Sequence, residues 1–379
     1  MKYVTLNPIA EKGLKCLGDT FSRVDTIEEA DAALVRSFSM LEMELPASLK
    51  AIARAGAGVN NIPLDRAAEK GIVVFNTPGA NANAVKELTL AALLLVSRDI
   101  LGGIRWVNDN RDDENLSKSM EKAKARFAGN EILNKTIGVI GLGAIGLKVA
   151  RSAAALGMHV IGYDPHMTNF KGNKLNEAIE VADSPAEVYA DADFVTIHIP
   201  EVPETKNFWN RDAFSLMKDG VTLLNLARAG LVNEADLKEA LESGKVARYV
   251  TDVPTHFTAN LPNVLAFPHL GASTEEAEDN CAVMAAEELK AYLECGNIIN
   301  SVNYPKVTLQ EKRNDRVGVL FSASDETSGA IGKIMEGAAE RSQSGVRNSY
   351  GYALFEGKGV HEKSAALEAV PGVIRVLMF

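Results

Sequence analysis

Short apolar runs alternate with amphipathic stretches along most of the chain. The runs that predict strands in its first part lie at 3–6, 33–36, 49–55 and 72–75, and the stretches that predict helices lie at 9–17 and 62–70. Strands that alternate with helices in this way favour a parallel sheet flanked by helices. A longer apolar stretch at 84–98 predicts another helix, and Asn83 is its expected N-cap.

The alternation continues after a polar stretch at 109–124, which predicts a surface helix or loop. Predicted strands follow at 136–140, 158–163, 194–198, 221–225, 249–252 and 264–267, and predicted helices at 234–242 and 275–293. Pro305 marks a change of pattern. The elements predicted beyond it are a strand at 317–321, a helix at 329–339, strands at 344–347 and 349–354, a helix at 363–369 and a strand at 373–379. This order predicts a small two-layer ferredoxin-like unit.

The composition is that of an ordinary globular protein, with 379 residues, 46% hydrophobic and 24% charged. The net charge of −10 comes without a basic run, so neither nucleic acid nor an anionic membrane is favoured as a partner. The three cysteines, Cys16, Cys281 and Cys295, have no metal-ligand spacing and no disulfide framework, which indicates a reducing, cytoplasmic location. The start of the chain is expected to be a strand and not a signal peptide.

A glycine-rich turn follows the predicted strand at 136–140 directly. Gly141 suits a tight turn, Gly143 allows a pyrophosphate to approach the backbone, and Gly146 allows a helix to pack close to its strand. Asp164 follows the next strand about 18 residues beyond the last glycine, near the spacing of about 20 typical of dinucleotide sites. Its carboxylate would bind ribose hydroxyls and repel a 2′-phosphate, which favours NAD over NADP. An ordinary strand-to-helix turn is the alternative interpretation.

Three polar segments follow other predicted strands. They are Asn225–Gly230, Pro268–Thr274 and His198–Pro200. The carboxyl ends of the strands in a doubly wound sheet line one crevice, at the point where the strand order reverses. We therefore expect the three segments to converge on the nicotinamide.

These segments, in this order, resemble the D-isomer-specific 2-hydroxyacid dehydrogenases. The resemblance covers about residues 1–305 and rests on GLGAIG, TIHIP, NLARAGLV and PHLGAST. It implies an α/β fold with a Rossmann-type doubly wound parallel sheet and a flavodoxin-like substrate domain. The implied domains are a substrate-binding domain at 1–92 completed by 282–305, and an NAD-binding domain at 93–281. The C-terminal α+β unit, at 310–379, resembles an ACT domain.

The resemblance also implies roles for individual residues. Arg228 would clamp the substrate carboxylate, since a guanidinium pairs with a carboxylate in a bidentate manner. His269 would exchange the hydroxyl proton, because histidine titrates near neutrality. Asp252 would hold the nicotinamide amide. The other residues expected at the cofactor are Gly141, Gly143, Ala144, Ile145, Gly146, Asp164, His198, Ile199, Pro200, Thr205 and Ala227.

One departure from the family pattern lies after Asp252. The family places a glutamate beside the catalytic histidine, a few residues after this aspartate. Here the segment reads Asp252-Val253-Pro254-Thr255-His256-Phe257, and His256 falls at or near that position. The pattern identifies no replacement acid. We expect catalysis to persist, with the acid limb of the pH–rate profile shifted down.

Substrate contacts are expected in the N-terminal part. Arg36 and Ser37 resemble the segment that meets the substrate phosphate, and Gly58 and Val59 resemble the turn whose backbone holds the substrate carboxylate. Residues at the start of the long helix form a further expected anion site, because free N–H groups lie there. These are Asn81, Asn83 and Lys86.

The activity that the resemblance implies is NAD-dependent oxidation of 3-phosphoglycerate to 3-phosphohydroxypyruvate, a step of L-serine biosynthesis. No metal is expected. The expected partners are a small-molecule substrate and further copies of the chain, in a homodimer or homotetramer joined through the stretch 105–127 around Trp106. Another D-2-hydroxyacid enzyme, such as a glyoxylate/hydroxypyruvate reductase or D-lactate dehydrogenase, is the alternative. A non-catalytic NAD-sensing partner protein is a second one.

Overall fold

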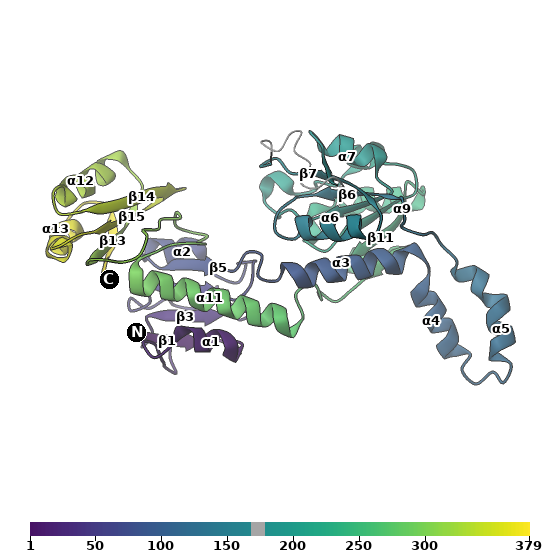
Figure 1. Cartoon of the computed structure of the whole chain (residues 1–379), viewed down its shortest axis with the longest axis horizontal. Coiled ribbons are helices and arrows are strands. Elements are labelled where there is room, and N and C mark those ends of the chain that lie inside the picture. The colour runs from purple at the N-terminus through teal and green to yellow at the C-terminus, as the bar shows by residue number, and fades with distance from the viewer. Residues whose placement is uncertain (168–178) are drawn as a thin grey trace. The chain divides into compact units, whose positions relative to one another are not determined.

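The computed structural model describes residues 1–167 and 179–379. The chain forms two compact units (Figure 1). The first unit contains residues 1–81 and 275–379, and the second contains residues 82–274. Each unit is described below by itself.

The first unit contains a five-stranded sheet in which all pairings are parallel, in the order β2-β1-β3-β4-β5. Its strands are β1 (Lys2–Thr5), β2 (Ser22–Arg23), β3 (Ala32–Val35), β4 (Ala51–Arg54) and β5 (Val73–Asn76). The helices packed with them are α1 (Glu11–Leu17), α2 (Leu64–Glu69) and the long α11 (Glu275–Cys295). This strand order is that of a flavodoxin-like sheet, so the prediction for this part is confirmed.

The second unit contains a seven-stranded parallel sheet in the order β12-β11-β10-β9-β6-β7-β8. The strands are β6 (Thr136–Ile140), β7 (His159–Tyr163), β8 (Ile179–Val181), β9 (Phe194–Ile197), β10 (Val221–Asn225), β11 (Val246–Thr251) and β12 (Val264–Ala266). The helices are α3 (Ala82–Ser97), α6 (Gly146–Ala155), α7 (Pro185–Asp191), α8 (Arg211–Ser215), α9 (Glu234–Glu242) and α10 (His256–Ala259). The order reverses between β6 and β9, as in a Rossmann-type fold. The predicted doubly wound sheet is confirmed.

A helical arm extends from the second unit between α3 and β6 (Figure 1). It consists of α4 (Ile100–Asp109), α5 (Leu116–Ala123) and the 3₁₀ turn η1 (Lys124–Phe127). No residue of α4 is buried, although one of its faces is apolar. The stretch expected as a surface helix or loop therefore contains one helix and the end of another.

The C-terminal part of the first unit is a four-stranded antiparallel sheet in the order β14-β15-β13-β16. Its elements are β13 (Arg316–Ser322), α12 (Asp325–Met335), β14 (Arg341–Arg347), β15 (Tyr350–Glu356), η5 (Val360–Lys363), α13 (Ser364–Glu368) and β16 (Val373–Met378). This topology is the predicted ferredoxin-like one. The predicted helix at 329–339 is wrong by one turn, because Ser324 caps the helix by accepting a hydrogen bond from the Thr327 N–H.

Both faces of the strand β15 are buried within the first unit. Along β15, Ala353 and Phe355 pack with α12 and α13, and the alternate residues Tyr352 and Leu354 join the core of the first sheet and α11. This period of two places the two sets on opposite faces. The Tyr352 hydroxyl also donates to the Gly296 carbonyl at 2.7 Å. The C-terminal sheet is therefore a layer of the first unit.

A buried ion pair lies at one end of this layer. Arg316 is 0% exposed and Glu356 is 1% exposed, and their Nε and Oε2 atoms are 2.7 Å apart. Arg316 also donates to the carbonyls of Cys295 and Gln310, on the segment that leads from α11 to β13. Burial raises the pKa of Glu356, but hydrogen bonds from Arg341 and Arg316 outweigh burial and leave its pKa lowered.

Two expectations about boundaries differ from the structure. Asn83 does not cap α3, because the helix begins at Ala82 and the Asn83 side chain donates to Glu87 one turn later. The contact boundaries fall at 81/82 and 274/275, whereas the expected ones were 92/93 and 281/282. The first of these differences arises because α3 packs on α6 and on β10 and β11 of the second sheet. The division into substrate-binding, NAD-binding and ACT-like parts stays a prediction.

One buried carboxyl group makes the first unit sensitive to pH. Glu288 on α11 is 3% exposed, its Oε1 accepts from the Asn300 amide at 2.6 Å, and its Oε2 has no partner in the described part of the chain. Burial raises the pKa of Glu288 to about 8 from an ordinary value of 4.5. The folded chain therefore holds a proton that the unfolded chain releases.

We expect the native chain to lose stability as the pH becomes alkaline. The variant Glu288→Gln should not show this loss. The stabilisation from this proton is complete below pH 4.5 and is lost as the pH rises through about 8, by up to about 1.4 kcal/mol per pH unit. Urea unfolding followed by circular dichroism at about pH 5 and about pH 8.5 measures it. Glu276, an exposed residue of the same helix, changed to Gln, is the control. Equal pH slopes for native chain and Glu288→Gln would contradict the assignment.

Candidate functional site

The candidate site of the second unit lies at the carboxyl edge of its sheet. All seven strands are parallel, so the segments that follow β6, β9, β10, β11 and β12 leave the sheet at the same edge. These segments carry the glycine turn, His198, Arg228, Asp252 and His269 in that order. The parallel pairing thus gathers residues that are far apart in the sequence.

The glycine turn has the geometry of a nucleotide site. Gly141 has a φ of 91°, and a Cβ there would lie 2.6 Å from the His198 carbonyl oxygen. A Cβ at Gly146 would lie 1.8 Å from the Gly141 oxygen. Around Gly143, in contrast, a Cβ would meet no atom within 4 Å. Two glycines are thus required by close packing, and Gly143, like Ala144, is open to a ligand.

Asp164 is fixed beside this turn. Its Oδ2 accepts from the Leu142 N–H and its Oδ1 from the His166 N–H, each at 2.9 Å. A carboxylate oxygen can accept more than one hydrogen bond, so each retains capacity for a ribose hydroxyl. Ile145 follows the open part of the turn and leads into α6.

The loop after β9 is held together by its own side chains. The Thr205 hydroxyl donates to the Pro200 carbonyl at 2.7 Å and accepts from the Val202 N–H. The His198 ring contacts the Thr196 hydroxyl through Nε2 at 3.0 Å, and its Nδ1 is buried without a partner in the described residues. Burial lowers the pKa of His198 to about 4, so this ring is neutral at physiological pH. Ile199 is half-buried in the same loop.

Asn225 positions the turn that carries Arg228, and sequence reasoning did not single it out. It is fully buried; its Oδ1 accepts from the N–H groups of Ala227 and Arg228, and its Nδ2 donates to the Arg228 carbonyl at 2.8 Å. Nδ2 also donates to the Tyr249 hydroxyl, whose pKa burial raises to about 12. The only signal for this role in the sequence is the position of an asparagine at the end of an apolar strand. The Arg228 side chain is exposed.

Asp252 lies near the two predicted catalytic residues. Both His269 and Arg228 exert an attractive electrostatic effect on its carboxylate. Its main-chain oxygen accepts from the His269 N–H at 2.8 Å, and its Oδ2 accepts from the Gly271 N–H at 2.9 Å. Burial raises the pKa of Asp252, and these bonds and charges oppose the rise. His269 is exposed and has a φ of 52°, which lies in the left-handed region. The chain therefore turns away from the direction of β12 at this residue.

The buried side chain of Asp252 fits the expected cofactor. Asp252 is 1% exposed, and its Oδ1 has no hydrogen-bond partner among residues 1–167 and 179–379. A buried acceptor of this kind is costly unless a donor is supplied, and a carboxamide N–H is a suitable donor. With the open Gly143 and the fixed Asp164, the second unit has matching groups for both ends of a dinucleotide.

The segment in which the family has a glutamate, and this chain has none, forms a short helix. Thr255 caps α10, which begins at His256, and the Thr255 hydroxyl donates to Glu234 at 2.5 Å. His256 is exposed. The carboxylate that the structure brings near His269 is that of Asp252, which the sequence assigned to the cofactor only.

In the first unit, the predicted substrate residues lie after β3 and β4. The Arg36 N–H donates to the Asn7 side chain, while Ser37 is exposed and Gly58 and Val59 are half-exposed. Sequence reasoning missed Arg54, at the end of β4, although its place at a strand end matches that of Arg36. The two guanidinium groups lie close enough together to act on the same thiol, that of Cys281.

The residues expected as an anion site at the start of α3 are already engaged in part. The Lys86 ammonium contacts Glu87 at 3.3 Å, and the Asn83 amide donates to the same carboxylate. Asn81 precedes the helix and is half-exposed. The structure therefore places Lys86 and Asn83 beside a carboxylate, which weakens the case for them as anion ligands.

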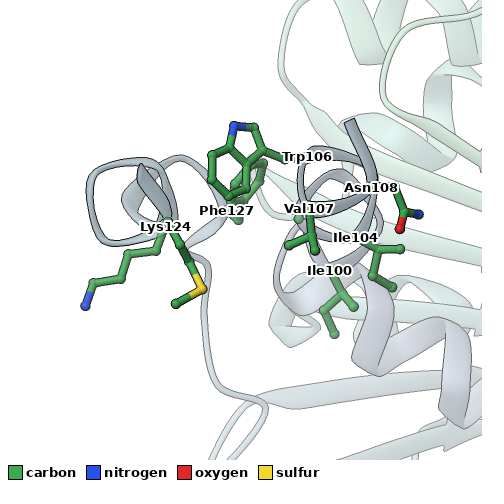
Figure 2. Close-up of a pocket in the computed structure, with 9 residues that line it drawn as sticks. Ile100, Ile104, Trp106, Val107, Asn108, Lys124 and Phe127 are labelled. Carbon is green, nitrogen blue, oxygen red and sulfur yellow. The ribbon is translucent and has the colours of Figure 1, made fainter. Parts of the chain in front are cut away.

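A second feature of the second unit is an apolar pocket of about 400 Å³ on the helical arm (Figure 2). The rings of Trp106 and Phe127 lie 6.5 Å apart at this pocket. Three large apolar side chains that are exposed by 52%, 42% and 42% gather at this pocket, namely Ile104, Val107 and Met120. The lining residues are Ile100, Gly103, Ile104, Trp106, Val107, Asn108, Met120, Lys124 and Phe127.

The described residues contain neither a cluster of metal ligands nor a helix that could span a membrane. No group of three or more His, Cys, Asp or Glu side chains there is arranged to hold a metal ion. No helix within those residues has the length and apolar character that crossing a membrane requires.

Residues 90–271 match the family described as D-isomer specific 2-hydroxyacid dehydrogenase, NAD binding domain. The chain is 37% identical over 298 residues to the D-3-phosphoglycerate dehydrogenase of Methanocaldococcus jannaschii, covering 76% of this chain and 54% of that protein. It is 32% identical over 363 residues to that of Archaeoglobus fulgidus, covering 90% and 66%. The chain thus spans a little more than half the length of the first of these relatives.

Solved structures agree with this assignment. The TT0316 protein from Thermus thermophilus has a TM-score of 0.64 at 29% identity, covering 80% of this chain and 100% of that one. The NAD⁺-bound 3-phosphoglycerate dehydrogenase of Entamoeba histolytica has a TM-score of 0.63 at 25% identity, covering 80% and 98%. The chain belongs to the D-isomer-specific 2-hydroxyacid dehydrogenase family, and its NAD-binding domain lies within residues 90–271.

Proposed function

We propose that the chain is an NAD-dependent dehydrogenase that oxidises 3-phosphoglycerate to 3-phosphohydroxypyruvate, the reaction that opens L-serine biosynthesis. The observation that carries the proposal is that Arg228, Asp252 and His269 follow three neighbouring parallel strands at one edge of the sheet, where Asp252 accepts hydrogen bonds from the backbone of His269 and Gly271. The names of the relatives support this substrate: the proteins from M. jannaschii and A. fulgidus are both D-3-phosphoglycerate dehydrogenases.

In the proposed mechanism each residue has one task. The guanidinium of Arg228 pairs with the substrate carboxylate and orients the hydroxyl-bearing carbon. His269 accepts the hydroxyl proton as the carbonyl forms, and returns it in the reverse direction. Asp252 orients the nicotinamide through its Oδ1, which has no partner in the described residues. Bound NAD supplies the acceptor for the hydride that leaves the substrate carbon.

The remaining predicted residues would bind the rest of the ligands. The glycine turn, with the exposed Gly143 and Ala144, would hold the pyrophosphate at the start of α6. Asp164 would bind the adenosine ribose. Arg36, Ser37, Gly58 and Val59 would bind the phosphate and carboxylate of the substrate. Asn81, Asn83 and Lys86 are weaker candidates for the same task, given the contacts to Glu87.

The experiment that tests this function measures NADH oxidation with a panel of 2-keto acids. The panel contains phosphohydroxypyruvate, hydroxypyruvate, glyoxylate and pyruvate. The proposal requires the highest kcat/KM for phosphohydroxypyruvate. A preference for an unphosphorylated acid would instead indicate a glyoxylate/hydroxypyruvate reductase or a D-lactate dehydrogenase. NADH binding without turnover of any acid would indicate a non-catalytic NAD-sensing protein.

The helical arm is the proposed contact between copies of the chain in a homodimer or homotetramer. Its apolar pocket and exposed Ile104 and Val107 support this, because a monomer rarely exposes such a patch. We expect Ile104→Asp to convert the oligomer to a monomer, as measured by light scattering after gel filtration. Leu133→Asp is the control, since Leu133 is 57% exposed and does not line the pocket. An unchanged mass for Ile104→Asp would contradict this interface.

The cytoplasmic location also remains a proposal. It is supported by Cys16, Cys281 and Cys295, all of which are free thiols.

A further inference from the structure

The residue proposed to bind the substrate phosphate already has a partner. The Nη1 atom of Arg36 lies 2.7 Å from Oε1 of Glu278 on α11. The two side chains are 37% and 43% exposed, so both the pair and its surroundings are open to a ligand. Arg36 and Glu278 belong to the same compact unit. The contact is therefore a property of that unit alone.

The backbone around Arg36 is held while its side-chain partner can change. The Arg36 N–H donates to the Asn7 side chain at 2.8 Å, and its carbonyl accepts from Asn61 at 3.3 Å. The Asn61 amide oxygen also accepts from Nε of Arg54 at 3.1 Å. Asn61 thus links the two segments that carry the guanidinium groups, so both remain in place whether or not Glu278 is bound.

The local charge balance includes one carboxylate against two guanidinium groups. Glu278, Arg36 and Arg54 all act electrostatically on the thiol of Cys281, one turn after Glu278 on α11. Burial raises the pKa of that thiol, so it adds no negative charge at neutral pH. A phosphate dianion that approaches Arg36 therefore meets a guanidinium already paired with the carboxylate of Glu278. It must also displace the Glu278 carboxylate or lie beside it, where like charges repel.

We propose that Glu278 is a specificity-determining residue of the proposed reaction. It competes with the substrate phosphate for Arg36 and so reduces the preference for a phosphorylated over an unphosphorylated 2-keto acid. This inference rests on the proposed function, because it takes Arg36 as the phosphate ligand. The substrate carboxylate and the reacting carbon are handled elsewhere, so the effect is confined to the binding of the phosphorylated substrate.

The test compares Glu278→Gln with the native chain in steady-state kinetics. An exposed ion pair of this kind contributes up to about 1 kcal/mol, so KM for phosphohydroxypyruvate should fall by up to about 5-fold. The value of kcat, and KM for hydroxypyruvate, should not change. Glu276→Gln is the matched control: it removes the same charge from the same helix, and Glu276 is exposed with no ion pair in the described residues. An unchanged KM ratio, or a higher KM for the phosphorylated acid, would overturn the inference.

A binding measurement separates this inference from the proposed function. Inorganic phosphate is titrated against the native chain, Glu278→Gln and Glu276→Gln, and the shift in Tm is recorded. Tighter phosphate binding by Glu278→Gln alone supports the competition, even if no 2-keto acid is turned over. Equal phosphate binding by all three chains overturns the competition, even if phosphohydroxypyruvate is the preferred substrate. If none of the keto acids is turned over but phosphate binding changes as expected, only the proposed function is rejected.

Discussion

Replacing His269 by Asn is expected to lower kcat by about 10²- to 10⁴-fold, the usual contribution of a positioned general acid or base. The imidazole is the group that exchanges the hydroxyl proton in the proposed reaction, and an amide cannot do so. Asparagine suits the test because it tolerates the left-handed backbone found there, with a φ of 52°. Steady-state NADH oxidation with phosphohydroxypyruvate measures the loss, and NADH fluorescence titration should show that cofactor binding is retained.

The matched control is His256→Asn. His256 lies in the segment where the family has its glutamate, is exposed, and begins the short helix α10. We expect its replacement to change kcat little, because the carboxylate brought near His269 belongs to Asp252. If His256→Asn removed activity and His269→Asn did not, the assignment of the acid–base role would be wrong. The acid limb of the native pH–rate profile would show in addition whether Asp252 compensates for the missing glutamate.

Replacing Glu356 by Ala is expected to destabilise the first unit by about 3–5 kcal/mol, the usual cost of leaving a buried charge without its partner. Arg316 is 0% exposed and pairs with Glu356 at 2.7 Å. Without this carboxylate, a guanidinium remains buried with only neutral acceptors, the carbonyls of Cys295 and Gln310 and the side-chain oxygen of Asn297. Both tryptophans, Trp106 and Trp209, lie in the second unit, so urea unfolding of the first unit is followed by circular dichroism.

Arg341→Gln is the control for this prediction. Its side chain is 28% exposed, and its removal leaves the pair of Arg316 and Glu356 intact. We expect a smaller loss of stability, in the range of partly exposed ion pairs, about 1 kcal/mol or less. Similar losses for both variants would show that the buried guanidinium is not the cause. Neither variant should change NADH binding, since both positions lie outside the NAD-binding domain.

The regular elements were predictable where the apolar pattern is strong. The strand at Val221–Asn225 and the helix at Glu234–Glu242 have the predicted bounds. The strands β2 and β8, of two and three residues, are too short to give a pattern and were missed. The predicted helix began only at Gly329, because the cap at Ser324 is visible only once its hydrogen bond to Thr327 is known.

The site was predictable at the strand ends and less so beyond them. Arg228, Asp252 and His269 follow three predicted parallel strands, so their convergence follows from the topology. The contact between Arg36 and Glu278 joins residues from distant parts of the sequence, and no local pattern signals it. The joint burial of the C-terminal sheet and the first sheet was not expected either. Alternation along a strand shows that two faces are covered, but not what covers them.

The segment between α11 and β13 is built into the first unit and does not act as a tether. Ile298 bridges to Val307, the Asn303 side chain pairs with the backbone of β5, and the Tyr304 hydroxyl donates to the Ala68 carbonyl. Limited proteolysis of the native protein should therefore spare these peptide bonds. A chimaera in which a foreign regulatory module replaces the C-terminal sheet would expose the face of α11 that packs on that sheet. Such a graft has to bring its own covering for Tyr292, or exchange the helix as well.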